Sequence, residues 1–256
     1  MSRNISVGGH NLNYTIIRQP VWSPFLVFLH EGLGCIGKWK DFPRKLCKAT
    51  SLTGIVYDRY GYGNSDGLEE PRPPDFLQRE AFDVLPELLE KLNIHKPVIL
   101  IGHSDGGSIA LLYAAKFPER VKALILEAPH VKIEELSARG LKAAILAYQY
   151  GDLKERLYKY HGENTDAMFW GWANIWTDER MRQWNIESFL PQIKAPLLFL
   201  QGEDDEYGTT EQLWSIVGRV KGTVEAEIIP GCGHIPHQQA EEFTLQRMQG
   251  FIAGMQ

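Results

Sequence analysis

A glycine-rich turn at residues 102–107, with the sequence GHSDGG, separates an apolar run at 97–101 from a helical pattern at 108–115. The run predicts a buried strand, and the glycines on both sides of Ser104 predict a turn too tight for a Cβ. Such a turn presents the serine hydroxyl to a substrate, and the next helix offers N–H groups and a positive dipole end. We therefore expect Ser104 to be a nucleophile; the alternative is an ordinary glycine-rich loop.

Short apolar runs alternate with helical patterns along most of the 256 residues. We expect strands at 5–7, 12–17, 25–29, 55–57, 98–101, 121–126, 196–200 and 224–229, the first two joined as a hairpin. We expect helices at 38–49, 76–92, 211–220 and 241–253, with Pro86 kinking the second. This alternation predicts an α/β fold with a mostly parallel sheet and helices on both faces.

The segment 131–190 departs from this alternation because it is helical in pattern, has no convincing strand and holds four of the seven tryptophans. We expect a helical cap at 131–190, inserted after the sixth strand of a core domain formed by 1–130 and 191–256. Most of its aromatic side chains should form the cap's own small core. A minority, Trp170 among them, should line a pocket, since a lid needs an apolar underside.

Composition excludes several classes of function. The net charge of −5 comes without a basic run, which argues against nucleic-acid binding. No apolar segment approaches the length of a membrane span, and the N-terminus lacks the apolar core of a signal peptide. The three cysteines, Cys35, Cys47 and Cys232, lack metal-ligand spacing. We expect them to be reduced, buried thiols in a cytoplasmic protein without a metal.

A serine nucleophile needs a base to take its proton and a third group to orient that base. His234 is the expected base, because it lies in a glycine-rich loop between the last strand and the last helix; His237 is the nearest rival. His103 is a neighbour of the nucleophile, but its side chain should point away from that of Ser104. The orienting acid should follow a strand, and four acids at 203–206 compete for that role.

Glu127, at the end of the preceding strand, offers an alternative acid from a different loop.

Oxyanion stabilisation needs two backbone N–H donors. We expect one from Asp105 and the other from Gly32, with Leu33 as an alternative, because glycines in the loop after strand 25–29 allow close approach to a ligand. His30 should hold this loop by hydrogen bonds.

Together these motifs resemble the α/β-hydrolase family. The order Ser104…Asp205…His234 is that family's order of nucleophile, acid and histidine. Residues 58–65 resemble its D-x-x-G-x-G-x-S loop, 202–205 its G-x-x-D acid motif and 233–236 its histidine loop. The resemblance spans essentially the whole chain, with the insertion as the variable cap, and it favours Asp205 over Asp204.

One position departs from the family's pattern: its usual His-Gly at the oxyanion loop is His30-Glu31 here, which adds a carboxylate beside the site. The serine nucleophile also separates this chain from haloalkane dehalogenases and epoxide hydrolases of the same fold, which attack with aspartate.

The resemblance implies a cofactor-independent hydrolase that cleaves a small or medium carboxylic ester through an acyl-enzyme. The same triad would also serve a C–C bond hydrolase, an acyl-homoserine lactonase or a receptor that keeps the residues without turnover. The pair Ser104-Asp105 resembles valacyclovir hydrolase-like enzymes, in which the acid after the serine binds the substrate's α-amino group. Asp105, with Glu31, would then hold an ammonium group; otherwise Asp105 only complements the helix dipole.

Overall fold

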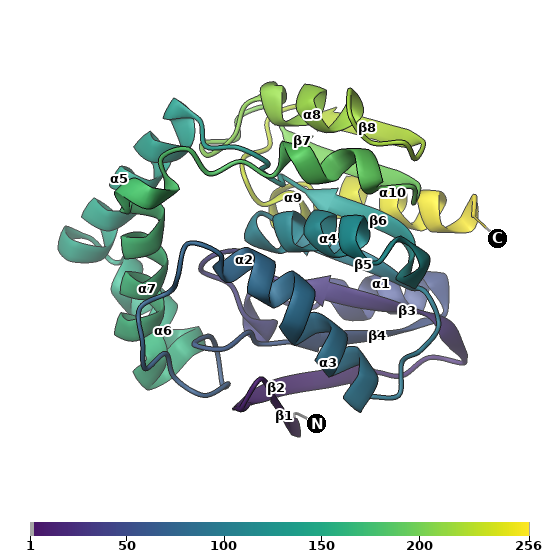
Figure 1. Ribbon diagram of the computed structural model, residues 1–256, viewed down its shortest axis with the longest axis horizontal. Helices are drawn as coiled ribbons and strands as arrows, with labels where there is room; N and C mark the ends of the chain where they lie inside the picture. Colours follow the sequence, from purple (N-terminus) through teal and green to yellow (C-terminus); the bar gives the residue numbers. More distant parts are fainter. Residues whose placement is uncertain (1–2, 256) are drawn as a thin grey trace.

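The computed structural model describes residues 3–255, which contain an eight-stranded sheet in the order β1-β2-β4-β3-β5-β6-β7-β8 (Figure 1). The strands are β1 (Arg3–Val7), β2 (His10–Ile17), β3 (Val21–Leu29), β4 (Leu52–Tyr57), β5 (Val98–His103), β6 (Val121–Glu127), β7 (Leu197–Gly202) and β8 (Val224–Ile229). β2 is antiparallel to β1 and β4, whereas the pairs from β4 to β8 are parallel. Each strand expected from the sequence is present, and the predicted fold class is confirmed.

The central strands are covered on both faces. β4, β5 and β7 are buried along their whole length. Successive side chains of a strand alternate between faces, so Ile99 and Ile101 join one hydrophobic cluster while Val98 and Leu100 join the other. A sheet buried in this way needs helices on both sides, which explains why its strands are continuous apolar runs.

Two helices, α1 (Phe42–Thr50) and α10 (Glu241–Ala253), cover one face of the sheet. The other face is covered by α2 (Phe76–Arg79), α3 (Leu85–Lys91), α4 (Asp105–Lys116) and α8 (Thr210–Val217). The helix expected at 76–92 is interrupted by a π-helical turn, η2 (Glu80–Val84), just before Pro86. A proline lacks the N–H that would continue the hydrogen-bond ladder. The kink expected at Pro86 stays a prediction.

Helices fill the connection between β6 and β7. They are α5 (Glu135–Tyr150), α6 (Leu153–His161), α7 (Thr165–Thr177) and a 3-10 segment, η6 (Glu187–Gln192). The first three lie together at one end of the sheet (Figure 1, left). Buried side chains of these helices, including Leu141, Phe169 and Trp172, form a third hydrophobic cluster. The insertion is helical as expected, while its description as a cap domain bounded at 131 and 190 stays a prediction.

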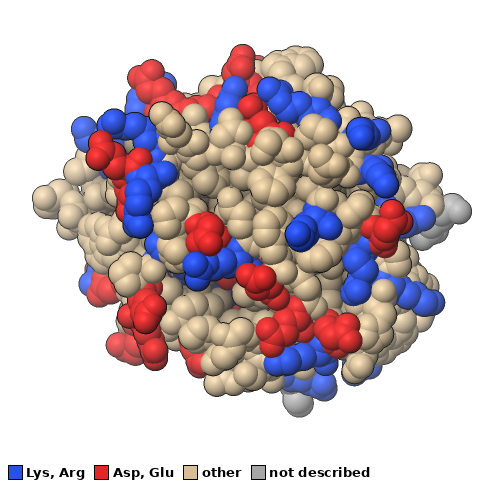
Figure 2. Space-filling model, viewed as in Figure 1, with Lys and Arg blue, Asp and Glu red and all other residues tan. Residues whose placement is uncertain are grey.

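The surface is mixed in charge: on the face shown in Figure 2, Lys and Arg side chains are interspersed with Asp and Glu. Within residues 3–255 no helix is both long and apolar enough to cross a membrane. Cys35, Cys47 and Cys232 are unpaired and buried. Burial raises the pKa of each thiol, to about 12 for Cys35 and Cys47 and about 11 for Cys232, so all three are poor nucleophiles.

Candidate active site

Ser104 stands at the turn between β5 and α4, at the carboxyl edge of the parallel strands. Its backbone has φ +52° and ψ −118°, a strained region for a residue with a side chain. A Cβ on Gly102 would collide with the backbone of Gly106, and one on Gly106 would collide with the carbonyl of Leu29. Glycine is therefore required on both sides of the serine, and the turn has the geometry of a nucleophile elbow.

His234 and Asp205 form a hydrogen-bonded pair. The distance between His234 Nδ1 and Asp205 Oδ1 is 2.8 Å, and both residues are buried. Asp205 also accepts hydrogen bonds from the backbone N–H groups of Tyr207 and Gly208 and from the amide of Gln201. Burial alone would raise the pKa of Asp205, but these bonds and His234 outweigh it and lower the pKa below its usual value. The acid is therefore ionised and fixes the His234 ring.

The rival residues have other partners. Asp204 is exposed, and its backbone N–H donates to the carbonyl of Cys232. His237 Nδ1 lies 2.7 Å from Glu127 Oε2, so these two residues form a buried pair of their own. Glu127 thus pairs with His237 rather than with His234. The structure therefore pairs the expected acid and base, Asp205 and His234, and pairs their rivals, Glu127 and His237, with each other.

Ser104 lines a pocket, and Tyr207 connects that pocket to the His234–Asp205 pair. The ring of Tyr207, which lines this pocket, lies 4.7 Å from the ring of His234. The ring of His103, the residue before the serine, lies 5.1 Å from the same ring. The pocket encloses a cavity of about 80 Å³ and is lined by Ser104, Asp105, His130, Lys132, Ile133, Ser137, Ala138, Leu141, Trp172, Trp176 and Tyr207.

The loop expected to supply the second oxyanion donor, which we call the oxyanion loop, accepts and donates hydrogen bonds with buried polar groups. The carbonyl of Glu31 accepts hydrogen bonds from Arg59 Nη2 at 2.8 Å and the N–H of Gly34 at 3.0 Å, and lies 2.8 Å from His30 Nδ1. His30 Nε2 accepts the backbone N–H of Arg59. The C=O and N–H of a trans peptide point in opposite directions, so the N–H of Gly32 points away from these groups. Gly32 itself packs against the side chains of Trp172 and Asp105.

Residues 24–187, well over half of the chain, match a family model described as alpha/beta hydrolase fold. This chain belongs to the α/β-hydrolase fold family. Serine hydrolase BPHL of Mus musculus is 26% identical over 251 residues, covering 95% of this chain and 84% of the mouse protein. The 2-hydroxy-6-oxo-6-phenylhexa-2,4-dienoate hydrolase of Burkholderia cepacia is 24% identical over 235 residues, covering 82% and 80%.

Solved structures show the same fold. The crystal structure of a bacterial membrane phospholipase A superposes with a TM-score of 0.82 at 23% identity, covering all of this chain and 86% of that protein. At this identity the likeness establishes the fold and leaves the substrate open.

Two residues expected at the substrate do not line this hydrolase's pocket. Trp170 lies in a separate hollow with Leu68 and Arg72. Two positions along a helix correspond to a rotation of about 200°, so Trp170 lies on the opposite side of α7 from Trp172, whereas Trp176 follows Trp172 by one turn. The aromatic wall of the pocket is therefore formed by Trp172 and Trp176 rather than by Trp170.

Glu31 is the second such residue. Its carboxylate lies 3.6 Å from Nδ1 of His103 and 3.9 Å from Nζ of Lys38, and it is not among the residues that line the pocket. Burial would raise the pKa of Glu31, but His103 and Lys38 lower it well below its usual value. The loop turns this carboxylate toward a buried imidazole, which is why it does not lie beside Asp105.

Asp105 does face the pocket, and its partners were not expected from the sequence. His130 Nε2 lies 3.4 Å from Oδ1, and Arg59 Nη2 lies 3.9 Å from Oδ2. Burial would raise the pKa of Asp105; His130 and then Arg59 outweigh it and lower the pKa. Both partners lie just beyond strand ends, Arg59 two residues after β4 and His130 three residues after β6. Their position at strand ends was the signal available in the sequence.

Oδ2 of Asp105 is buried and has no hydrogen-bond partner in the described structure. The Asp105 carboxylate therefore keeps a buried oxygen with unused acceptor capacity, near Arg59 and Gly32. No group of three or more His, Cys, Asp or Glu side chains suited to a metal ion occurs among residues 3–255.

Proposed function

We propose that this α/β hydrolase is a serine hydrolase that cleaves small or medium carboxylic esters through an acyl-enzyme. The observation that carries the proposal is the placement of Ser104 on a strained elbow, at positive φ, facing the pocket beside the His234–Asp205 pair. When Nδ1 of the His234 ring donates to the ionised carboxylate of Asp205, Nε2 keeps a lone pair. This is the arrangement that a serine nucleophile needs for activation.

The reaction follows from these roles. His234 Nε2 takes the proton of Ser104 as the hydroxyl oxygen attacks the ester carbonyl. The N–H groups of Asp105 and Gly32 stabilise the tetrahedral oxyanion, each contributing roughly 2.7–4 kcal/mol by comparison with other oxyanion donors. His234 then gives its proton to the departing alcohol. Water loses a proton to the same histidine, attacks the acyl-enzyme and releases the acid and free Ser104.

The pocket supports a compact substrate. One water molecule needs about 10–15 Å³ of such space, so a cavity of about 80 Å³ takes a group of several non-hydrogen atoms. The walls from Trp172, Trp176 and Leu141 favour an apolar acyl or alcohol portion. The carboxylate of Asp105, the residue after the serine, also lines the pocket, as does Lys132.

A second candidate, an amino-acid ester hydrolase, is favoured by the unpartnered Oδ2 of Asp105. An α-ammonium group next to the scissile carbonyl would supply the missing donor and match the negative charge. Arg59 and His130 already offset part of that charge, although neither lies within normal hydrogen-bond distance of Oδ2 in this geometry. We therefore place plain ester hydrolysis first and amine recognition second.

The test of the main proposal is turnover of p-nitrophenyl acetate and butyrate by wild type and Ser104→Ala. Loss of the hydroxyl should lower kcat/KM by at least about 10⁴-fold, since removing a triad member leaves only oxyanion and binding contributions. A fluorophosphonate probe should label wild type and Ser108→Ala, one turn along α4, but not Ser104→Ala. Unchanged turnover in Ser104→Ala would refute the proposal.

Amine recognition is tested by comparing alanyl and propionyl esters of one alcohol. We expect the alanyl ester to have a kcat/KM about tenfold or more higher, and Asp105→Asn, which keeps the backbone N–H, to remove the preference. Equal specificity constants in wild type would exclude this candidate. A lactone and a vinylogous diketone in the same panel separate ester hydrolysis from lactone and C–C bond cleavage.

A further inference from the structure

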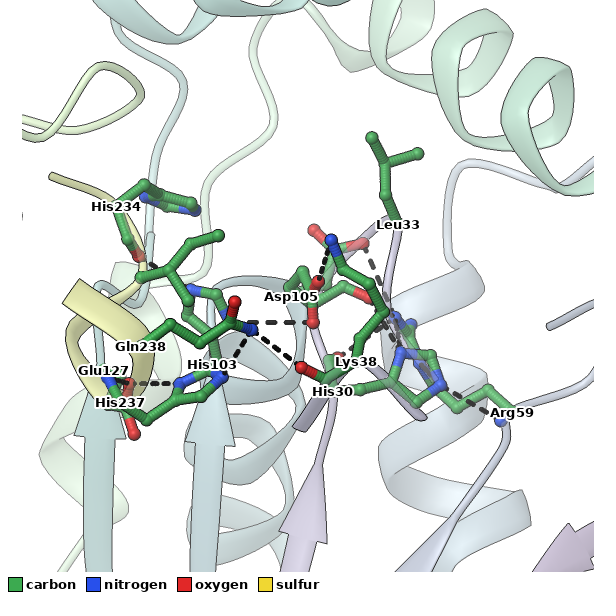
Figure 3. A network of polar contacts seen from close by, with 12 residues as sticks. His30, Leu33, Lys38, Arg59, His103, Asp105, Glu127, His234, His237 and Gln238 are labelled. Carbon is green, nitrogen blue, oxygen red and sulfur yellow. Dashed lines mark hydrogen bonds and ion pairs between the residues drawn. The ribbon is translucent and has the colours of Figure 1, made fainter. Parts of the chain in front are cut away.

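His103 precedes the proposed nucleophile, yet its side chain contacts the loop that contains His234. It is fully buried, and its Nε2 lies 2.8 Å from the backbone carbonyl oxygen of His234. Figure 3 shows the rings of His103 and His237 next to each other, beneath His234. The imidazole therefore connects the end of β5 to the backbone of the residue proposed as the catalytic base.

The two nitrogens of His103 face acceptors on opposite sides. A carbonyl oxygen only accepts, so Nε2 must carry a proton and donate it to His234. Nδ1 lies 3.6 Å from Oε2 of Glu31. A lone pair on Nδ1 would be repelled by that carboxylate, whereas an N–H would be attracted to it. The surroundings thus favour protons on both nitrogens, which makes the ring an imidazolium.

The oxyanion loop leaves space for the Glu31 carboxylate to lie next to His103. A Cβ on Gly34 would collide with the carboxylate of Glu31, so the absence of a side chain at position 34 leaves room for Glu31 to fold inward. Lys38 Nζ lies 3.9 Å from the other oxygen, Oε1. The Glu31 side chain is 14% exposed and that of His103 is 0% exposed. The pair is therefore a shielded side-chain contact between the loop after β3 and the end of β5.

We propose that His103 is a positioning residue for the hydrolase: paired as a cation with Glu31, it holds the carbonyl of His234 and ties the histidine loop to the oxyanion loop. This role rests on the function proposed above. The base and the second oxyanion donor would then move as one unit, because Glu31 is the residue before Gly32. Small displacements of the base or the oxyanion donor lower kcat rather than substrate affinity.

The charged groups around His103 support a cation at this position. Glu31 faces it from the oxyanion loop and Glu127 from the end of β6, while His237 is paired with Glu127 and His234 with Asp205. Burial would lower the pKa of His103, but Glu31 and then Glu127 outweigh it and raise the pKa above its usual value. The centroids of the His103 and His234 rings lie 5.1 Å apart.

The first experiment observes the charge itself, without substrate. In protein with ¹⁵N-labelled histidine at pH 7.5, the His103 signal, assigned by its loss in His103→Gln, should show protons on both ring nitrogens. In Glu31→Gln the same ring should carry one proton, because the facing carboxylate is gone. A singly protonated His103 in wild type overturns the proposal whether or not the protein hydrolyses esters.

The second experiment separates position from charge. His103→Gln keeps a neutral donor for the carbonyl of His234, whereas His103→Leu removes donor and charge. With p-nitrophenyl butyrate, kcat should fall about tenfold in His103→Leu and less in His103→Gln, with KM nearly constant. In both variants the acid limb of the kcat/KM profile should move up by about one pH unit.

A merely structural role would lower the yield of folded enzyme without moving this limb. Wild type that turns over the ester, with His103 variants that keep both kcat and the acid limb, would overturn the positioning role while leaving the proposed function intact. Absence of wild-type turnover and of serine labelling would instead refute the proposed function, and the ¹⁵N experiment would still decide the charge of His103.

Discussion

Two histidines three residues apart, His234 in the loop after β8 and His237 in the short helix α9 (Pro236–Gln239), form carboxylate pairs of almost the same geometry. The His234–Asp205 distance is 2.8 Å and the His237–Glu127 distance is 2.7 Å. Their surroundings differ: the His234 ring lies beside Tyr207 at the pocket, whereas the His237 ring packs against Trp39 at 4.5 Å and Phe42 at 5.6 Å.

The difference teaches that a histidine–acid pair is not a catalytic unit by itself. Glu127 also accepts the backbone N–H of His237, and its own carbonyl accepts the N–H of Ser104 at 2.9 Å. The sealed pair therefore joins the histidine loop to the elbow. We assign the His237–Glu127 pair to stability and the His234–Asp205 pair to the proposed chemistry. Mutation of each acid tests this assignment.

The largest effect is expected for Asp205→Asn. The amide keeps the volume of the side chain but no longer favours the His234 tautomer and charge that the reaction needs. We expect kcat for p-nitrophenyl butyrate to fall about 10⁴-fold, by comparison with other serine triads. A fall of less than tenfold would show that the acid of the triad has been assigned wrongly.

Glu127→Gln should have the opposite profile. Removing the charge of Glu127 weakens the buried hydrogen bonds that its carboxylate accepts from His237, and a hydrogen bond to a charged group contributes about 1.5–3 kcal/mol of stability. Urea unfolding should show this decrease, while kcat per folded molecule stays within a few fold of wild type. If kcat instead falls as far as in Asp205→Asn at unchanged stability, the two pairs have exchanged roles.

Another buried histidine, His161, has backbone groups rather than an acid as its hydrogen-bond partners, and it can be compared with the two pairs. His161 Nδ1 accepts the N–H of Gly63 and its Nε2 donates to the carbonyl of Leu33, so the ring must be neutral. Burial lowers its pKa from 6.5 to about 4.

A group whose folded-state pKa is lowered stabilises the fold above its unfolded pKa, and this stability is lost as pH falls through the folded value. We therefore expect about 3 kcal/mol of the unfolding free energy to disappear between pH 6.5 and 4 through this residue. Urea titrations at several pH values should show a shallower decline for His161→Gln than for wild type. Parallel declines would contradict a buried neutral ring.

The smallest effect concerns the pocket wall on α7. Trp176→Ala should lower kcat/KM about tenfold by removing apolar contact with the substrate, whereas Trp170→Ala should leave it within about twofold. Both variants should be compared at equal folded fraction, because Trp170 packs against Tyr148 and Phe169. A larger loss in Trp170→Ala would place substrate on the other side of the helix.

Much of the fold was predictable because its signals are local. Continuous apolar runs marked the buried strands, and glycines at positions 102 and 106 marked the elbow through sterics alone. The direction of Glu31 was not predictable. Gly34 is visible in the local pattern and leaves space for the side chain, but the buried imidazole that Glu31 faces comes from a strand 72 positions away.

By itself, the sequence determined the order of strands and helices, the strained serine turn and the strand ends where chemistry gathers, because neighbouring residues impose these features. Only the tertiary structure decided which histidine meets which acid, which tryptophans face the serine and where Asp105 finds its partners. The His237–Glu127 contact spans 110 positions and the His103–His234 contact spans 131. Such pairings arise when the carboxyl ends of separate strands are brought to one edge of the sheet, and local patterns do not encode them.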